Sequence, residues 1–351
     1  INVLDVIQTK LIILGKEKEL TLVDSVDRIV TVKKPIKSIV VARPPFVEMV
    51  RSVGAKDRLI GVPSYKGNRY PRFFPELDEL TNIGTHPIDC EVILNLNPDI
   101  ALMDGYSGMN NPCCDVLGAA DITVYRINPH SKRPGAVPYD YLREIQRLGY
   151  VLDTEKEAEE FSDWYHGFMD KITERVSGLS DDEKPRLYYE KHRPYTTGGG
   201  DSVDMQSCEC AGAKNIFNDI GGGSIKVDPE EVVRRDPEIM VKISGACNYE
   251  IDDSSEAEVI RETFMSRPEL ATVAAVKDGK VYILPAAFVN CYGGTPSHYF
   301  IGIPYMAKLF QPELFEDLDP QAIHQEFLTR FQRIDYDLDE WGVLVYPPFE
   351  D

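Results

Sequence analysis

The stretch LTLVDSVDRIVTVKKPIKSIVVA, residues 20–42, contains the two patterns that decide the fold. Its first half alternates apolar and polar residues on either side of a short polar break, which predicts a β-hairpin. Its second half ends in SIVVA, residues 38–42, a continuous apolar run typical of a strand buried in a parallel sheet. We therefore expect a hairpin that leads into a parallel sheet.

Strand and helix patterns alternate after this stretch. Residues 45–55 (PFVEMVRSVGA) have helical periodicity and close on Gly54, a suitable C-cap, and residues 58–62 (RLIGV) follow as a strand. Residues 90–105 (CEVILNLNPDIALMDG) predict a helix, an Asn-Pro-Asp turn and a buried strand, and residues 121–127 (DITVYRI) predict another strand. This alternation is typical of an open parallel sheet.

A long helical pattern divides the chain at residues 154–179, with Asp153 or Thr154 as its N-cap and acidic residues in its first turn. The alternation resumes beyond it, before closing helices. The later segments are RLYYEK (186–191) as a strand, VDMQSCECAGAKNIF (203–217) as a helix, PEEVVRRDPEIMVKI (229–243) as a helix plus strand, and KVYIL (280–284) as a strand. Two similar α/β halves thus flank one long helix.

Length and composition agree with this division. A chain of 351 residues exceeds the usual size of a single core, so two α/β domains are expected. The net charge of -20 disfavours a nucleic-acid partner and an anionic membrane surface, since both bind clustered cations. No apolar run reaches the ~18 residues that a membrane span requires. The chain opens at Ile1 without a signal-peptide pattern, which we interpret as a processed or trimmed start.

The seven cysteines show no metal-ligand spacing. We predict mostly free, buried or half-buried thiols and no metal site. Adjacent Cys113 and Cys114 form a strained disulfide at best, and Cys208 and Cys210 point in different directions on a helix. The weaker alternative is a metal site built from Cys210, Cys247, Cys291 and a histidine.

The first residues differ from the rest of the chain. Residues 1–15 predict a short amphipathic helix. Asn2 and Asp5 resemble the late ligand positions of a dockerin-type calcium loop whose earlier half is missing. We interpret this start as the remnant of a dockerin-like linker module and expect no calcium site in it.

The order of the apolar segments carries a family resemblance. Residues 20–42, 53–62 (VGAKDRLIGV), 91–103 (EVILNLNPDIALM), 269–285 (ELATVAAVKDGKVYILP) and 307–315 (AKLFQPELF) together resemble the binding proteins that serve iron-siderophore, haem and vitamin B12 importers. The resemblance spans residues 20–315, nearly the whole chain.

This resemblance implies a class III periplasmic-binding-protein-like fold: α/β, with two doubly wound, Rossmann-like lobes bridged by a single long helix. The expected division is a remnant at 1–19, an N-terminal lobe at 20–152, the bridging helix at 153–179, a C-terminal lobe at 180–335 and a tail at 336–351. It further implies a non-enzymatic, monomeric protein outside the cytoplasm, anchored through a segment upstream of Ile1, which delivers its ligand to the permease of an ABC importer.

Basic and aromatic residues collect in the loops after the predicted strands, where open α/β sheets bind ligands. Guanidinium groups bind carboxylate, phosphate or catecholate oxygens, and tyrosines cover the flat face of a chelate. We therefore expect an anionic metal chelate in an inter-lobe cleft, first a ferric siderophore-like iron complex and alternatively cobalamin or haem, with no cofactor of the protein's own. The candidate ligand-binding residues are Arg43, Tyr65, Arg69, Tyr70, Arg72, Tyr106, Arg126, His192, Arg193, Tyr195, Phe288 and Tyr292.

Residues 196–201 (TTGGGD) form a glycine-rich turn ahead of a helix. The turn lacks the G-K-[ST] ending of a phosphate-binding P-loop and does not match G-x-G-x-x-G, so we favour a loop beside the ligand, as the resemblance implies, over nucleotide binding.

The resemblance also implies one exposed glutamate on each lobe that docks against permease arginines. The pattern matches Glu91 and Glu230, each placed ahead of a helix that ends in an Asx-Pro turn, with Glu231 as a substitute for Glu230. The simpler alternative is an acid that complements the helix dipole.

No catalytic motif is present. Two other classes stay open at this point: a metal-cluster redox protein, because of the cysteines, and a cell-surface interaction protein, because of the dockerin-like start.

Overall fold

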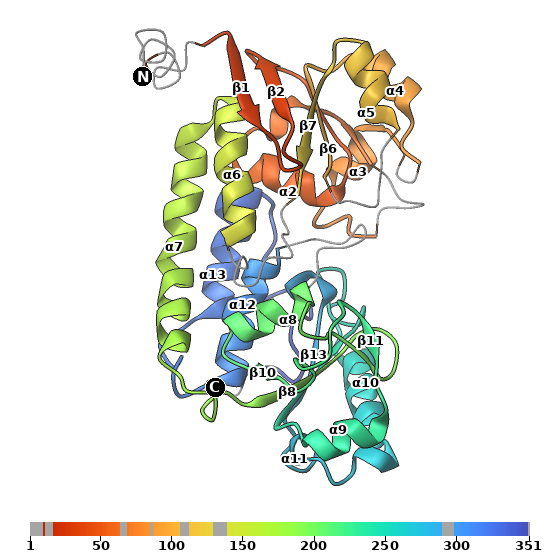
Figure 1. The fold of residues 1–351 in the computed structure, drawn as a ribbon, viewed down its shortest axis with the longest axis vertical. Coiled ribbons are helices and arrows are strands. Elements are labelled where there is room, and N and C mark those ends of the chain that lie inside the picture. The colour runs from red at the N-terminus through yellow and green to blue at the C-terminus, as the bar shows by residue number, and fades with distance from the viewer. Residues whose placement is uncertain are drawn as a thin grey trace. The chain divides into compact units, whose positions relative to one another are not determined.

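The computed structural model describes residues 10, 17–63, 69–84, 87–105, 112–128, 139–289 and 298–349 (Figure 1). The chain forms two compact units, Ile1–Pro129 with Tyr141–Asp163, and His130–Asp140 with Trp164–Asp351. Helix α7, Glu155–Ser177, contributes its first residues to one unit and the rest to the other, and it matches the long helical pattern of the sequence. None of the helices within the described ranges is long and apolar enough to cross a membrane.

The predicted hairpin is confirmed in the first unit. Strands β1, Glu19–Val23, and β2, Ile29–Lys33, pair antiparallel. Asp24 shapes the turn, because its carboxylate accepts hydrogen bonds from the backbone N–H groups of Val26 and Arg28, each at 3.0 Å.

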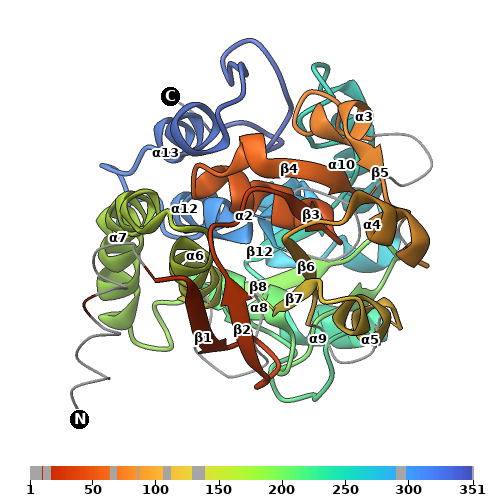
Figure 2. The same cartoon turned by 90° about the horizontal axis from the view of Figure 1, so that it is seen from above.

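A five-stranded parallel sheet forms the centre of the first unit (Figure 2). Its order is β5-β4-β3-β6-β7, which is the doubly wound arrangement with a topological switch point between β3 and β6. The predicted strands at 38–42, 58–62, 100–104 and 121–127 are therefore confirmed as parallel. The bounds are β3 Ile39–Val41, β4 Leu59–Val62, β5 Thr81–Asn82, β6 Ile100–Asp104 and β7 Thr123–Ile127.

Short helices connect these strands. The predicted helix after β3 ends as expected, since Gly54 has a positive φ of 71° that glycine adopts without strain. The core on one side of the sheet is continuous from Val40 and Met103 to Leu117. The helices are α2 Pro44–Ser52, α3 Glu76–Glu79, α4 Cys90–Leu96, α5 Cys113–Ala119 and α6 Tyr139–Leu152.

The second unit repeats the design with a four-stranded parallel sheet, β10-β8-β12-β13, whose switch point lies between β8 and β12. Two parallel α/β sheets, one in each unit, confirm the predicted fold class. The strands are β8 Arg186–Glu190, β10 Lys214–Asn215, β12 Ile239–Ile243 and β13 Val281–Leu284, with a small pair β9 Thr196–Thr197 and β11 Ile225–Lys226. The helices are α8 Val203–Cys210, α9 Pro229–Arg235, α10 Ser255–Met265, α11 Ala274–Lys277, α12 Tyr299–Phe310 and α13 Pro320–Glu326.

The predicted helix at 203–217 was too long. Helix α8 ends at Cys210, because Gly212 takes a positive φ of 91°, and the chain then enters β10 beside β8. Apolar periodicity alone does not reveal a two-residue strand.

The expectation for the cysteines is partly wrong, because Cys90 and Cys113 form a disulfide. Their Cα atoms lie 5.4 Å apart although 23 residues separate them, since α4 and α5 begin side by side. The other described cysteines, Cys114, Cys208, Cys210 and Cys247, form no disulfide, as predicted. Burial raises the pKa of Cys247 to about 12, and burial together with Glu209 does the same for Cys210, so both are protonated at neutral pH and poor metal ligands.

A buried polar cluster of the second unit joins the loop after β12 to α12 and α13. The Tyr249 hydroxyl lies 2.5 Å from Nε2 of His298 and 2.7 Å from Nε2 of His324, and the Tyr305 hydroxyl lies 3.2 Å from Nδ1 of His324. Both histidines are fully buried. Burial, followed by the neighbouring His298, lowers the pKa of His324 well below its ordinary 6.5.

We expect His324 to make the protein less stable at acidic pH. Below about pH 6.5 the unfolded chain binds a proton that folded His324 does not, so stability falls by up to ~1.4 kcal/mol per pH unit through this group. Melting temperatures of wild type and His324→Gln from pH 7.5 to about pH 5 test this, with His166→Gln on the exposed side of α7 as the control. Parallel pH profiles for wild type and His324→Gln would contradict it.

Candidate functional site

The switch point of the first unit carries an ion pair. Arg43 follows β3 and occupies the N-cap position of α2, and Asp104 is the last residue of the neighbouring β6. The two side chains are buried, and Nη1 of Arg43 donates to Asp104 at 2.5 Å. The predicted ligand-binding Arg43 is therefore at the expected edge of the sheet, but Asp104 neutralises its charge.

The other candidates of the first unit occupy different environments. Arg69 and Arg72 are exposed, and Tyr70 between them is half-buried, on the segment that follows β4. Arg126 was expected in the loop after a strand, but it lies within β7 itself, where it is half-buried and its guanidinium lies close to the Cys114 thiol. Tyr65 and Tyr106 lie outside the described residues.

The switch point of the second unit is built around a buried carboxylate, Glu190, at the end of β8. Arg267 donates two hydrogen bonds to it, at 2.8 and 2.9 Å, and Lys242 of β12 donates a third at 2.9 Å. The backbone N–H of Tyr195 adds a fourth at 2.8 Å. Burial acts to raise the pKa of Glu190, but Arg267 and Lys242 outweigh it and the pKa is lowered. Sequence reasoning missed Glu190, because a carboxylate that ends a strand resembles an ordinary surface acid.

This buried network holds residues 191–195 (KHRPY), which we call the basic loop. The loop closes on itself, since the Lys191 N–H donates to the Thr196 carbonyl at 2.8 Å. Tyr195 has a positive φ of 53°, and its ring covers the Arg267 guanidinium at 4.9 Å. Lys191 pairs with the buried Asp204 at 2.8 Å, which leaves His192 and Arg193 as the exposed polar members of the loop, beside exposed Pro194.

The chemistry of the basic loop suits an anion. Partial burial and the nearby Lys242 lower the pKa of His192, so its imidazole is neutral at pH 7 and offers one N–H donor. Arg193 forms no ion pair with any other residue that the structure describes, so its planar guanidinium faces water. Burial and a hydrogen bond to Glu269 raise the pKa of Tyr195 to about 12, which keeps its hydroxyl protonated.

The glycine-rich turn before α8 is not a phosphate cradle. The N–H groups of Gly199 and Gly200 donate to the carbonyls of Gly222 and Ile220, each at 2.9 Å, so neither is available to an anion. A Cβ atom on Gly199 would lie 2.2 Å from the Ile220 carbonyl oxygen, which explains the glycine. These contacts agree with the preference for a loop over a nucleotide site.

Buried hydroxyl groups lie beside this turn. Thr197 ends β9, Ser202 occupies the N-cap position of α8 without a side-chain cap bond, and Ser207 lies within α8. Their hydroxyl oxygens are buried and have no hydrogen-bond partner within the described ranges. Each can donate one hydrogen bond to a ligand or water. These side chains were also missed from the sequence, because serine and threonine are common in turns.

Phe288 is fully buried and stacks on Tyr305 at 4.8 Å, so it belongs to the core of the second unit in this structure. Tyr292 lies outside the described residues. Three cavities of about 440, 840 and 420 Å³ open elsewhere in the second unit, and none of them is lined by a predicted ligand-binding residue.

Glu91 and Glu230 occupy equivalent places in the two units. Each is the second residue of a seven-residue helix, α4 or α9, in the first turn rather than ahead of the helix. In each case an aspartate caps the helix: Asp89 accepts from the Glu91 N–H at 3.0 Å, and Asp228 from the Glu230 N–H at 2.9 Å. Both side chains are exposed, whereas Glu231 is held by Arg234 at 2.6 Å.

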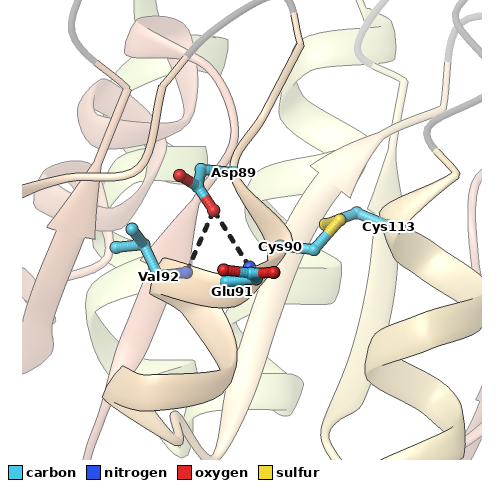
Figure 3. The surroundings of a disulfide bond; sticks show 5 residues. All are labelled: Asp89, Cys90, Glu91, Val92 and Cys113. Carbon is cyan, nitrogen blue, oxygen red and sulfur yellow. Dashed lines mark hydrogen bonds between the residues drawn. A yellow bond between two sulfur atoms is a disulfide. The ribbon is translucent and has the colours of Figure 1, made fainter.

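Figure 3 shows that Glu91 directly follows the disulfide-bonded Cys90. The disulfide links the first turn of α4 to the first turn of α5, and Asp89 caps the same turn through Glu91 and Val92 (Figure 3). Glu91 thus projects from a helix start that is tied down on two sides.

Comparison with known proteins agrees with this architecture. The chain matches the family model described as a periplasmic binding protein over residues 39–288. It is 23% identical over 331 residues to the molybdate-binding protein MolA of Haemophilus influenzae, across 89% of this chain and 91% of the relative. It is also 23% identical over 301 residues to YvrC, an uncharacterized ABC transporter substrate-binding lipoprotein of Bacillus subtilis, across 85% and 87%.

Among solved structures, the TroA-like periplasmic binding protein FepB of Veillonella parvula shares the fold with a TM-score of 0.77, covering 93% of this chain and 99% of that one at 22% identity. At this identity the likeness shows the fold alone. The family model covers more than two thirds of the chain, and the sheets and switch points agree with it. The chain therefore belongs to the periplasmic binding protein family, as a non-enzymatic, extracytoplasmic solute-binding protein of an ABC transporter.

Proposed function

We propose that this protein captures an anionic metal chelate, with a ferric siderophore-like iron complex as the first candidate, and delivers it to its permease. The observation that carries this proposal is the basic loop at the switch point of the second sheet. It exposes Arg193 and neutral His192 in a protein whose net charge is -20. A bare cation would instead call for carboxylates at this edge.

The ordered surroundings of the loop support a binding role. Glu190 holds the Tyr195 backbone, and Asp204 holds Lys191, so the exposed side chains start from a rigid base. Preorganised donors lose less entropy on binding than mobile ones. In the first unit, exposed Arg69 and Arg72 offer further guanidinium groups. The predicted position of the ligand between the two lobes stays a prediction.

Ligand titration tests the proposal. Quenching of the two tryptophans, Trp164 and Trp341, is measured against a ferric tris-catecholate, a ferric hydroxamate, haemin, cobalamin and molybdate. We expect a ferric chelate to bind with a Kd of about 1 μM or below. Absence of micromolar binding to every metal complex in the series would overturn the proposal.

Removing a loop cation is expected to weaken binding. Arg193→Ala should raise the Kd of the ferric chelate by roughly 10- to 100-fold, because a hydrogen bond to a charged group contributes about 1.5–3 kcal/mol. Isothermal titration calorimetry measures the change. Arg234→Ala is the matched control, since Arg234 is an exposed arginine on α9, which precedes β12 and so lies at the opposite edge of the sheet. An equal loss in both variants would mean that net charge, and not the loop, sets the affinity.

A small oxyanion is the second candidate ligand, because of the three buried hydroxyls of Thr197, Ser202 and Ser207. Hydroxyl donors suit the oxygens of a tetrahedral anion, and the relative MolA is a molybdate-binding protein. Tight binding of molybdate, lost in Ser202→Ala and without competition from ferric chelates, would favour this candidate. Cobalamin and haem are the next ligands to compare.

The same proposal includes the docking role of Glu91 and Glu230. It also includes the division of the chain into two lobes, a monomeric state and attachment to a membrane or cell surface.

Membership of a binding-protein family argues against a metal-cluster redox enzyme. The dockerin-like start, with Asn2 and Asp5, lies outside the described residues. A pull-down with a cohesin-type partner tests the interaction role that this start suggests.

A further inference from the structure

Three carboxylates from separate parts of the first unit meet where α6 gives way to α7. Glu17 precedes β1, Asp153 follows α6, and Glu155 opens α7. Each offers one oxygen such that the three oxygens all lie within 4.8 Å of one another. Glu17 is only 6% exposed, so this acidic group is not a solvated surface cluster.

The local fold explains how these acids come together. Asp153 takes a positive φ of 54° and ends α6, and the Thr154 N–H donates to the Gly149 carbonyl at 2.9 Å. Lys34, just after β2, binds across the junction. Its ammonium donates to Glu17 at 2.6 Å, to Asp153 at 2.5 Å and to the Tyr150 carbonyl at 2.5 Å.

Lys34 does not complete the cluster. Its three N–H donors are used by the three acceptors named, and the lysine side chain is 2% exposed. Oε2 of Glu17, Oε1 of Glu155 and the hydroxyl of Thr154 are buried with no partner in the part of the chain that the structure describes. Glu17 and Thr154 are more than nine-tenths buried. The unpartnered carboxylate oxygens of Glu17 and Glu155 therefore point to a ligand that is itself positive.

The charge balance indicates a divalent cation. Three carboxylates and one ammonium leave a formal charge of -2 at this junction. A buried charge without a partner is strongly unfavourable. The three side chains that meet here offer carboxylate oxygens, which are ligands of hard cations. Calcium accepts irregular sets of protein oxygens, whereas magnesium demands near-ideal octahedral geometry and retains water.

We propose that Glu17, Asp153 and Glu155 form a calcium site that ties the segment before β1 to the start of α7. The site is separate from the predicted ligand-binding residues and does not depend on which solute the protein carries. Calcium sites of extracellular modules bind with Kd values of about 0.1–1 mM, a range that suits a protein outside the cytoplasm. The sequence does not reveal this site, because Glu17 is more than 130 residues away from the other ligands.

Calcium titration of the whole chain tests the site. After treatment with a chelator, calcium binding is followed by calorimetry and by terbium luminescence, which nearby Tyr150 can sensitise. We expect one saturable site with a Kd of about 0.1–1 mM and a melting temperature raised by roughly 5 °C at saturating calcium. An equal ionic strength of magnesium or sodium chloride should give a clearly smaller shift.

Variants locate the binding. Glu155→Gln is expected to raise the calcium Kd by at least about ten-fold, with Glu17→Gln as a second variant of the same site. Glu159→Gln, an exposed carboxylate on α7, is the matched control and should bind as wild type. Glu155 is only half-buried, so this variant is expected to fold, which circular dichroism verifies. No saturable binding up to about 10 mM calcium, or equal binding by wild type and both site variants, would overturn the proposal.

Discussion

Replacing Glu190 with glutamine is expected to lower the free energy of unfolding by about 3–5 kcal/mol, the cost of removing one partner from a buried ion pair. Glu190 is fully buried and forms ion pairs with both Arg267 and Lys242. The uncharged amide leaves both cations without a carboxylate in a poorly solvated place. The carboxylate accepts hydrogen bonds from Arg267 and Lys242. The amide replaces one of the accepting oxygens with an NH₂ group, which is itself a hydrogen-bond donor and cannot accept these bonds.

Urea unfolding followed by circular dichroism measures this loss. Glu256→Gln, an exposed acid on α10 of the same unit, is the control and should change stability by less than about 0.5 kcal/mol. The double variant Glu190→Gln/Lys242→Met should lose less than the sum of the single variants, because one unpaired cation is removed. A loss for Glu190→Gln no larger than that of the control would show that the network is not a stabilising centre.

Removing both proposed docking carboxylates should abolish most transport while leaving ligand capture intact. Glu91 and Glu230 are exposed, lie at matching positions of α4 and α9, and are aimed by capped first turns. Loss of one partner of an interfacial charge pair typically costs 2 kcal/mol or more. We therefore expect each alanine variant to reduce uptake by roughly 10-fold and the double variant by roughly 100-fold or more.

Uptake of the bound ligand by the cognate importer in proteoliposomes measures the effect, and calorimetry confirms an unchanged ligand Kd. Glu231→Ala is the discriminating control. Its carboxylate is already paired with Arg234, so it should transport nearly as wild type. A larger loss in Glu231→Ala than in Glu230→Ala would transfer the docking role to Glu231. Wild-type uptake by the double variant would exclude both glutamates from docking.

Glu91 illustrates how far sequence reasoning reached. The family resemblance implied such a glutamate, the local pattern DCEVILNLNPD (89–99) matched it to Glu91, and the structure places Glu91 in the first turn of the helix within that pattern. The disulfide one residue earlier was not predicted, because Cys113 meets Cys90 only through the packing of α5 against α4. Helix caps follow from neighbours in sequence, whereas cysteine pairing depends on neighbours in space.

For the candidate ligand-binding residues, too, the sequence predicted the position along the chain but not the contacts in space. The sequence placed Arg43 and Arg193 after buried strands, and both do follow strands of the two sheets. Only the structure shows that Asp104 neutralises Arg43 while Arg193 remains exposed. Because the acceptor, Asp104, belongs to a different strand from Arg43, no local sequence pattern predicts this ion pair.

Local sequence patterns were enough to predict the alternation of strands and helices, the long helix observed at Glu155–Ser177 and the binding-protein architecture. Those properties depend on apolar periodicity, turn residues and their order, which are written locally along the chain. Which charges pair with one another depends on the tertiary structure, as the pairs Glu190–Arg267 and Glu17–Lys34 show. The reason is physical: the free energy of a buried charge depends on the groups that folding brings within a few ångströms of it, and these come from distant segments.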